Sequence, residues 1–174
     1  MKSKTKAYEI VKPKNQLFLH GYEKYFKSFI KLVDKNELPS VILLTGHKGI
    51  GKSTFAYHFI NFIFSKNEEN TYSLNEYKIN SNNRSYNLLA ENIHPNFFLL
   101  ESDQDKETIK IEQIRHLLKF LNKSTYSNNL KIVFLDNAEY LNINSSNALL
   151  KALEEPPKNC LLYTSDAADD SLRF

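Results

Sequence analysis

Cysteine is almost absent from this chain of 174 residues, and this shortage and others exclude several classes of protein. The single cysteine, Cys160, allows neither a disulfide within the chain nor a cluster of cysteines around a metal. The longest strongly apolar stretch, residues 40–45, is too short to span a bilayer, and no apolar run follows the basic N-terminal residues. The sequence therefore predicts a soluble, cytoplasmic protein without a signal peptide.

An excess of charge of one sign is also lacking. The net charge is only +3, from 23 basic and 20 acidic residues. Such a small value does not by itself indicate binding to nucleic acid or to a membrane surface. The basic residues are scattered, so the sequence does not define a DNA-binding face. The length and the 41% content of hydrophobic residues are sufficient for one domain with a core.

Glycine is scarce as well, with four residues in the chain, yet three of them lie between positions 46 and 51. They belong to residues 46–53, which match the phosphate-binding pattern Gly-x-x-x-x-Gly-Lys-Ser. In that pattern the glycines let backbone N–H groups approach phosphate oxygens, Lys52 binds the β- and γ-phosphates, and the Ser53 hydroxyl binds Mg²⁺. The predicted contacts with a nucleoside triphosphate come from Gly46, His47, Lys48, Gly49, Ile50, Gly51, Lys52, Ser53 and Thr54. A chance match in a turn is the alternative, but it does not explain the gathering of glycines between an apolar run and a helical pattern.

The spacing of apolar residues predicts an α/β fold. Continuous apolar runs predict strands at 41–44, 97–100 and 131–136, and helical spacing predicts helices at 22–33, 54–64, 111–121 and 145–155. The first run is expected to be buried on both faces. Strands that alternate with helices form a parallel sheet flanked by helices. The polar stretch 65–92 is predicted to be an insertion or a long surface loop, with a short helix near Leu88 and Leu89.

A carboxylate at the end of a neighbouring strand would complete a metal site beside the loop. Asp136 follows four apolar residues, and we expect it to hold the water shell of the Mg²⁺ ion that Ser53 binds. The alternative is a strand-terminal Asp that begins a turn. The next residue is Asn137, which cannot act as a general base, and Glu139 lies two residues further on. The sequence therefore predicts nucleotide binding, whereas Asn137 argues against hydrolysis.

Other nucleotide-binding classes fit less well. A GTPase reads guanine with Asn-Lys-x-Asp, whereas Asn122 and Lys123 are followed by Ser124 and Thr125. An Arg-rich lid of the nucleoside-kinase type is not evident. An unrelated P-loop kinase or transferase stays an alternative, but it leaves residues 147–157 unexplained.

Residues 147–157, Asn-Ala-Leu-Leu-Lys-Ala-Leu-Glu-Glu-Pro-Pro, closely resemble one family. They are similar to the delta-prime subunits of bacterial DNA polymerase III clamp loaders, and the resemblance spans most of residues 15–159. Gly21 and the segments 38–46, 94–98 and 131–142 match the family as well. By this resemblance residues 1–159 are identified as an AAA+ nucleotide-binding domain, a P-loop NTPase that is incomplete at its C-terminus.

The resemblance implies cofactors and partners. It implies ATP with Mg²⁺ but no zinc, because many members carry a four-cysteine module where this chain has the cysteine-free stretch 65–92. The implied partners are the other subunits of a hetero-oligomeric ring, the sliding clamp and, through the assembly, primed DNA, with no membrane. The adenine base is expected near residues 11–22. A ring component that binds ATP without turnover, which Asn137 favours, and an ATP-hydrolysing motor subunit both stay open.

The C-terminal segment departs from the family. The family continues beyond Glu-Glu-Pro-Pro to a Ser-Arg-Cys motif, a helical lid and a collar domain, which this chain lacks. Residues 160–170 instead resemble one reading frame of a transposon-end sequencing adapter. We therefore expect the natural sequence to stop near Asn159 and residues 160–174 to be a cloning or assembly scar, to be left out of fold reasoning. The alternative is a genuine strand from Leu161 to Thr164, with Thr164 or Ser165 as a nucleotide-sensing residue.

Sequencing the gene from native genomic DNA tests the origin of this segment. We expect the reading frame to depart from the present sequence after Asn159 and to continue into Ser-Arg-Cys, because residues 166–170 fit nothing in the family. A genomic stop codon directly after Phe174 would contradict an adapter origin.

Overall fold

The centre of the protein is a sheet of four parallel strands, seen in a computed structural model that describes residues 11–102, 108–123, 130–154 and 160–167. For residues 151–153 and 165–167 the description covers the backbone alone. The strands are β1 (Val41–Gly46), β2 (Phe97–Leu100), β3 (Lys131–Leu135) and β4 (Cys160–Ala167), in the order β1-β4-β3-β2. Because every neighbouring pair is parallel, the carboxyl ends of the strands meet at one edge of the sheet.

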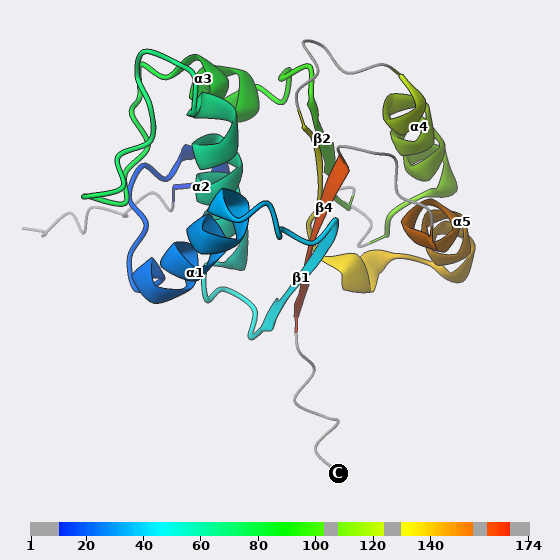
Figure 1. Ribbon diagram of the computed structural model, residues 1–174. Helices are drawn as coiled ribbons and strands as arrows, with labels where there is room; N and C mark the ends of the chain where they lie inside the picture. The colour runs from blue at the N-terminus through cyan, green and yellow to red at the C-terminus, as the bar shows by residue number, and fades with distance from the viewer. Residues whose placement is uncertain (1–10, 103–107, 124–129, 155–159, 168–174) are drawn as a thin grey trace, which may run out of the picture.

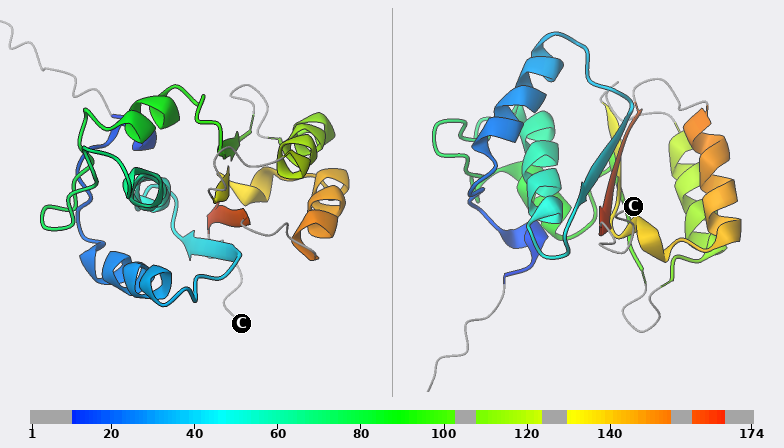
Figure 2. Two further views of the ribbon diagram at one scale, coloured as in Figure 1. Left: turned by 45° about the horizontal axis from the view of Figure 1, so that its top comes forward. Right: turned by 90° about the horizontal axis from the view of Figure 1, so that it is seen from below.

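Helices cover both faces of the sheet, which gives a three-layer architecture (Figures 1 and 2). On one face lie α1 (Glu23–Asp34), α2 (Lys52–Ser65) and α3 (Arg84–Ala90), preceded by the short helix η1 (Pro13–Asn15). On the other face lie α4 (Ile111–Asn122) and α5 (Ile143–Glu154), with η3 (Ala138–Tyr140) between β3 and α5. The predicted α/β fold with a parallel sheet flanked by helices is confirmed. In the described part of the chain, no helix is long and apolar enough to cross a membrane.

Strand β3 is the central element because both of its faces are buried. Ile132 and Phe134 belong to the apolar cluster against α1 and α2, and Val133 and Leu135 belong to the cluster against α4 and α5. All four side chains are at most 2% exposed. Successive side chains of a strand point to opposite faces, so a strand between two helical layers needs an uninterrupted apolar run.

Strand β1 departs from the expectation of burial on both faces. Ile42 and Leu44 pack in the cluster against α1 and α2, but Val41 and Leu43 point to the opposite face and are 38% and 56% exposed. Among the described residues β1 pairs with β4 alone, so it lies at an edge of the sheet. An apolar run therefore does not by itself distinguish an edge strand from a central one.

The stretch 65–92 is packed more closely than the predicted surface loop. The short helix expected within it is confirmed as α3, whose N-terminus is capped by the Asn83 side chain. Tyr72, Ile79 and Leu89 are at most 5% exposed and belong to the same cluster as the apolar side chains of α2. These three residues follow no helical or strand period. The sequence pattern therefore does not predict that they are buried.

Residues 160–167 form strand β4 between β1 and β3. Leu161, Leu162 and Tyr163 are at most 5% exposed, so this part of the C-terminal segment is packed within the sheet. The structure agrees here with the alternative expectation of a strand from Leu161 to Thr164. The conformation of a segment does not reveal its origin, so the adapter origin stays a prediction.

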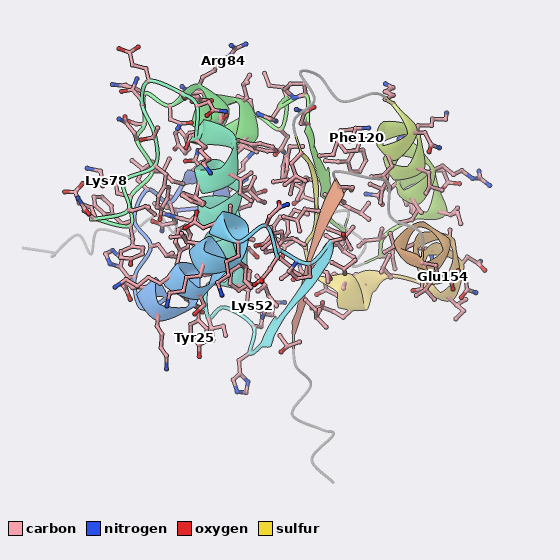
Figure 3. All side chains as sticks on the ribbon, viewed as in Figure 1. Tyr25, Lys52, Lys78, Arg84, Phe120 and Glu154 are labelled. Atoms are coloured by element: carbon pink, nitrogen blue, oxygen red, sulfur yellow. The ribbon has the colours of Figure 1, made fainter. Side chains whose placement is uncertain are left out.

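A buried lysine links the start of β3 to the end of α4. Lys131 is 4% exposed, and its Nζ donates to the carbonyl oxygens of Phe120 (2.7 Å), Leu121 (2.9 Å) and Lys123. The last carbonyls of a helix have no partner within the helix, so the ammonium satisfies them and they offset the cost of its burial. The ammonium also lies 5.1 Å from the centroid of the Phe120 ring, which is labelled in Figure 3.

His58 on α2 is a second buried polar residue. Its side chain is fully buried between two hydrogen-bond partners, with Nε2 at 3.1 Å from the Gln16 carbonyl and Nδ1 at 2.9 Å from the Tyr72 hydroxyl. A neutral ring protonated at Nε2 donates to the carbonyl and accepts from the hydroxyl, so both bonds are satisfied. Burial lowers the pKa of His58 to about 4.

This low pKa predicts a loss of stability in mild acid. Above about pH 6.5 the ring is neutral in both states, and its contribution to stability is complete. As the pH falls from about 6.5 toward 4, the unfolded chain binds a proton that the folded chain does not, so the free energy of unfolding decreases. The loss from this residue reaches about 3 kcal/mol at about pH 4.

Urea unfolding between pH 7.5 and 4 measures the effect. His58→Gln should flatten the decrease, because the amide does not titrate. The matched control His116→Gln, on the exposed side of α4, should behave as the wild type does. A His58→Gln protein with the same pH dependence as the wild type would contradict the assignment.

Candidate functional site

Residues 46–53 form a tight loop between the end of β1 and the start of α2. Gly46, Gly49 and Gly51 have φ angles of +146°, +84° and +98°, which other residues adopt only with strain. A Cβ on Gly46 would come within 2.7 Å of Ile50 Cδ1, so the exposed Ile50 side chain would have to move in addition to the backbone strain. The strand, glycine loop and helix that the motif predicts are therefore present in that order.

Lys52 is the first residue of α2, and its ammonium lies over the loop. Nζ donates to the carbonyl oxygens of Gly46 (2.6 Å) and His47 (3.0 Å). Figure 3 places Lys52 between α1 and β1. The first N–H groups of a helix have no partners within it and carry a positive partial charge. The ammonium and the helix N-terminus therefore give this end of the sheet a positive potential that suits an anion.

The nine residues predicted to bind nucleotide all lie in this loop and in the first turn of α2. The exposed part of the loop consists of His47, Lys48, Gly49 and Ile50, and the half-buried part consists of Gly46, Gly51, Lys52, Ser53 and Thr54. The exposed tip can reach a ligand by its backbone, and the half-buried residues anchor the loop to the sheet.

The structure brings the two predicted metal ligands together. Ser53 Oγ donates a hydrogen bond of 2.8 Å to Asp136 Oδ1, across 83 residues of sequence. Asp136 directly follows β3, and its backbone N–H donates to the Leu100 carbonyl at 2.9 Å. A hydroxyl and a carboxylate, both of which could bind a metal ion, thus lie beside the glycine loop at the carboxyl edge of the sheet.

Neither Asn137 nor Glu139, which follow Asp136 in sequence, places a carboxylate beside it. Asn137 adopts a left-handed backbone conformation, with φ of +59°, at which the chain turns into η3. Glu139 lies within η3 and its side chain is exposed to solvent. An amide at position 137 accepts no proton, as the sequence indicates.

Glu101 is a site residue that the sequence analysis missed. It directly follows β2, and the pairing of Leu100 with Leu135 places it beside Asp136 at the same edge of the sheet. Although Glu101 is exposed, partial desolvation by its neighbours and the negative charge of Asp136 raise the pKa of its carboxyl, and the charges of Lys14 and Lys12 partly offset this effect. The sequence pattern that identifies Asp136, a carboxylate directly after a predicted strand, also applies to Glu101 and could have identified it.

The Tyr57 side chain lies close enough to Glu101 and Asp136 to be affected by their charges. It lies on α2, one turn after Ser53, and is 6% exposed. Burial is the main cause that raises the pKa of its phenol, and the negative charges of Glu101 and Asp136 raise it further. Both carboxylates therefore act on the α2 side of the sheet, where the glycine loop lies.

A pocket of about 630 Å³ opens beside the loop. It is lined in part by Tyr22, Tyr25 and Phe29 of the α1 region, by Leu43 of β1, and by Ile50 and Lys52. The Tyr22 hydroxyl donates to the Ile50 carbonyl at 2.5 Å, which connects the wall of the pocket to the loop. Of residues 11–22, where the adenine base was expected, Gly21 and Tyr22 line this pocket.

Thr164 on β4 does not take the position expected of a nucleotide-sensing residue. Leu161 and Tyr163 belong to the cluster on the α2 side, and Leu162 belongs to the other cluster, so alternation places Thr164 on the face away from the loop. Its Oγ1 is buried without a hydrogen-bond partner among the described residues. The side chain of Ser165, the other candidate, lies outside the described residues.

Known sequences resemble this chain over most of its length. The sequence model of the family described as DNA polymerase III, delta subunit, matches residues 21–170. DNA polymerase III subunit delta' of Pseudomonas aeruginosa is 34% identical over 120 residues, which are 69% of this chain and 35% of the relative. DNA polymerase III subunit gamma of Buchnera aphidicola subsp. Acyrthosiphon pisum is 30% identical over 128 residues, 71% of this chain and 32% of the relative. The chain spans about a third of the length of these curated relatives.

One solved structure is matched at low identity. It is the crystal structure of a DNA polymerase III gamma subunit-related protein from Thermotoga maritima, 21% identical, with a TM-score of 0.49. The match covers 81% of the present chain and 38% of the Thermotoga maritima chain. The resemblance to clamp-loader subunits that residues 147–157 indicate is confirmed by the sequence matches. Since the family match covers well over half of the chain, the protein belongs to the family described as DNA polymerase III, delta subunit.

Proposed function

We propose that this chain binds ATP with Mg²⁺ at residues 46–53, as part of a clamp-loader subunit of the delta-prime type. The observation that carries the proposal is the convergence of the glycine loop, the N-terminus of α2 and the Ser53–Asp136 pair at one edge of the sheet. Each part suits one part of the ligand: the loop suits the phosphates, the hydroxyl and the carboxylate suit the metal, and the adjoining pocket suits the base.

The loop fits a triphosphate by its shape and its charge. Positive φ angles at Gly46, Gly49 and Gly51 turn the backbone sharply, which lets backbone N–H groups approach a phosphate. The Lys52 ammonium, now on the carbonyl oxygens of Gly46 and His47, is in reach of an anion bound inside the loop. Charge-assisted bonds to phosphate are stronger than these bonds to neutral carbonyls, so a phosphate would draw the ammonium to itself.

The metal ligands fit Mg²⁺ by their chemistry. Mg²⁺ prefers oxygen ligands and keeps several waters, so one hydroxyl and one carboxylate beside a triphosphate are sufficient. When bound, the ion would neutralise charge on the phosphates. Ser53 would bind the ion directly. Asp136, whose Oδ1 lies 2.8 Å from the Ser53 hydroxyl oxygen, would orient the waters around the ion. The proposal includes no zinc ion.

The names of the relatives support a role in replication. They are DNA polymerase III delta' and gamma subunits, and the chain spans about a third of their length. We propose that the protein works in the cytoplasm within a hetero-oligomeric clamp-loader ring of the DNA polymerase III holoenzyme. Its partners there would be the other subunits, the sliding clamp and, through the assembly, primed DNA, without a membrane.

Removal of the loop lysine tests phosphate binding. Lys52→Ala should weaken ATP binding at least tenfold, about 1.4 kcal/mol, because the loop loses its side-chain cation aimed at the phosphates. Titration calorimetry with ATP and Mg²⁺ measures the affinity. The matched control is Lys66→Ala, an exposed lysine just past the other end of α2, which should bind as the wild type does. Equal affinities of the Lys52→Ala and wild-type proteins would count against the site.

Removal of the carboxylate charge tests the metal site. Asp136→Asn should bind ATP without Mg²⁺ about as the wild type does, but should lose most of the gain in affinity that Mg²⁺ gives the wild type. Calorimetry with Mg²⁺ and with EDTA measures that gain. Glu139→Gln, at an exposed position on η3, is the control and should keep the full gain. An Asp136→Asn protein with the same gain from Mg²⁺ as the wild type would exclude the metal role.

A further inference from the structure

We propose that Glu101 is the general base for ATP hydrolysis at this site, in place of the residue after Asp136. The inference rests on ATP binding as proposed above, and it adds a catalytic residue and turnover to it. Position 137 holds an amide, and Glu139 on η3 is exposed to solvent. A carboxylate that is to serve as the base must therefore come from another strand.

The strand register supplies such a carboxylate. Leu100 of β2 pairs with Leu135 of β3, so the residues that follow them, Glu101 and Asp136, are neighbours at the carboxyl edge of the sheet. The hydrogen bond from the Asp136 N–H to the Leu100 carbonyl, 2.9 Å long, continues the pairing to this point. Neighbouring strands lie about 4.8 Å apart, which is within reach of one bridging water between two carboxylates.

The alternation of side chains places Glu101 on the productive face. Leu99 and Phe134 belong to the cluster on the α2 side, and Leu100 and Leu135 belong to the cluster on the α4 side. The next residue on each strand returns to the α2 side, which is the side of the glycine loop. The Ser53–Asp136 hydrogen bond demonstrates this orientation for β3, and the same alternation applies to β2.

The surroundings hold the Glu101 backbone and leave its carboxylate accessible. The Gln113 side chain on α4 donates to the Glu101 carbonyl at 2.9 Å, which fixes the chain where it leaves β2. Among the described residues, no hydrogen bond or ion pair within 4.0 Å engages the Glu101 carboxylate, and the residue is exposed to solvent. A base needs such an unengaged oxygen for the proton that it accepts.

The reaction assigned to Glu101 is the activation of a water molecule. The water oxygen forms a bond to the γ-phosphorus while Glu101 accepts one proton from the water. The bond from the γ-phosphorus to the β–γ bridging oxygen breaks, and its electron pair leaves with ADP. The products are ADP, inorganic phosphate and one proton, which Glu101 later releases to solvent, and no further reactant is needed. Lys52 neutralises the charge of the phosphates during the step.

The test compares ATP turnover and ATP binding in the full-length protein, alone and in the assembled ring. Glu101→Gln keeps the size of the side chain and removes its basicity, so kcat should fall about a hundredfold or more. ATP affinity should stay equal or increase, because a negative charge near the phosphates is removed. Glu101→Asp should keep an intermediate kcat, because its carboxylate is shorter by one methylene but still basic. The control Glu139→Gln should retain wild-type turnover.

The outcomes separate this inference from the proposed function. A fall in kcat for Glu101→Gln, with ATP affinity retained and partial rescue by Glu101→Asp, supports Glu101 as the base. Wild-type turnover in Glu101→Gln, or ATP binding by the wild type without any turnover, overturns it while ATP binding stands. Absence of ATP binding by the wild type overturns both. Thermal unfolding of each variant checks the fold, and Glu101→Asp keeps the comparison valid if Glu101→Gln is unstable.

Discussion

Strand β3 is hydrogen-bonded to a parallel neighbour on each side and packed against helices on each face, and the position of every other site element follows from it. Parallel pairing brings the ends of β1, β2 and β3 to one edge of the sheet. The glycine loop, Glu101 and Asp136 leave the strands there, although they are up to 90 residues apart in sequence. The Ser53–Asp136 hydrogen bond then connects α2 to β3 across β4.

Features with a strong local pattern could be predicted from the sequence. Strand 97–100 and the helix over 111–121 lie where the apolar spacing places them, because both elements bury a regular set of side chains. The glycine loop was found because its geometry needs glycine at defined positions in a short segment. Asp136 was found because a carboxylate after a buried strand faces the same edge as the loop. In each case a short local segment of sequence is enough to predict the feature.

Features that depend on strand order or on isolated contacts could not be predicted in this way. The exposure of Val41 and Leu43 follows from the edge position of β1, which no local pattern records. Glu101 gains its neighbour from the register of β2 against β3, although its position after a strand was visible. Tyr72 and Lys131 are buried by side-chain contacts with helices that pack against them, which no apolar period records. The burial of such residues can be recognised only from the three-dimensional structure.

The edge position of β1 has a consequence for handling the chain in solution. Among the described residues, one side of this strand has no sheet partner, and its backbone N–H and C=O groups line a flat border next to exposed Val41 and Leu43. Proteins usually protect such borders with charged side chains, proline or a bulge, and residues 41–46 contain neither charge nor proline. At high concentration such a border is a template for strand addition between molecules.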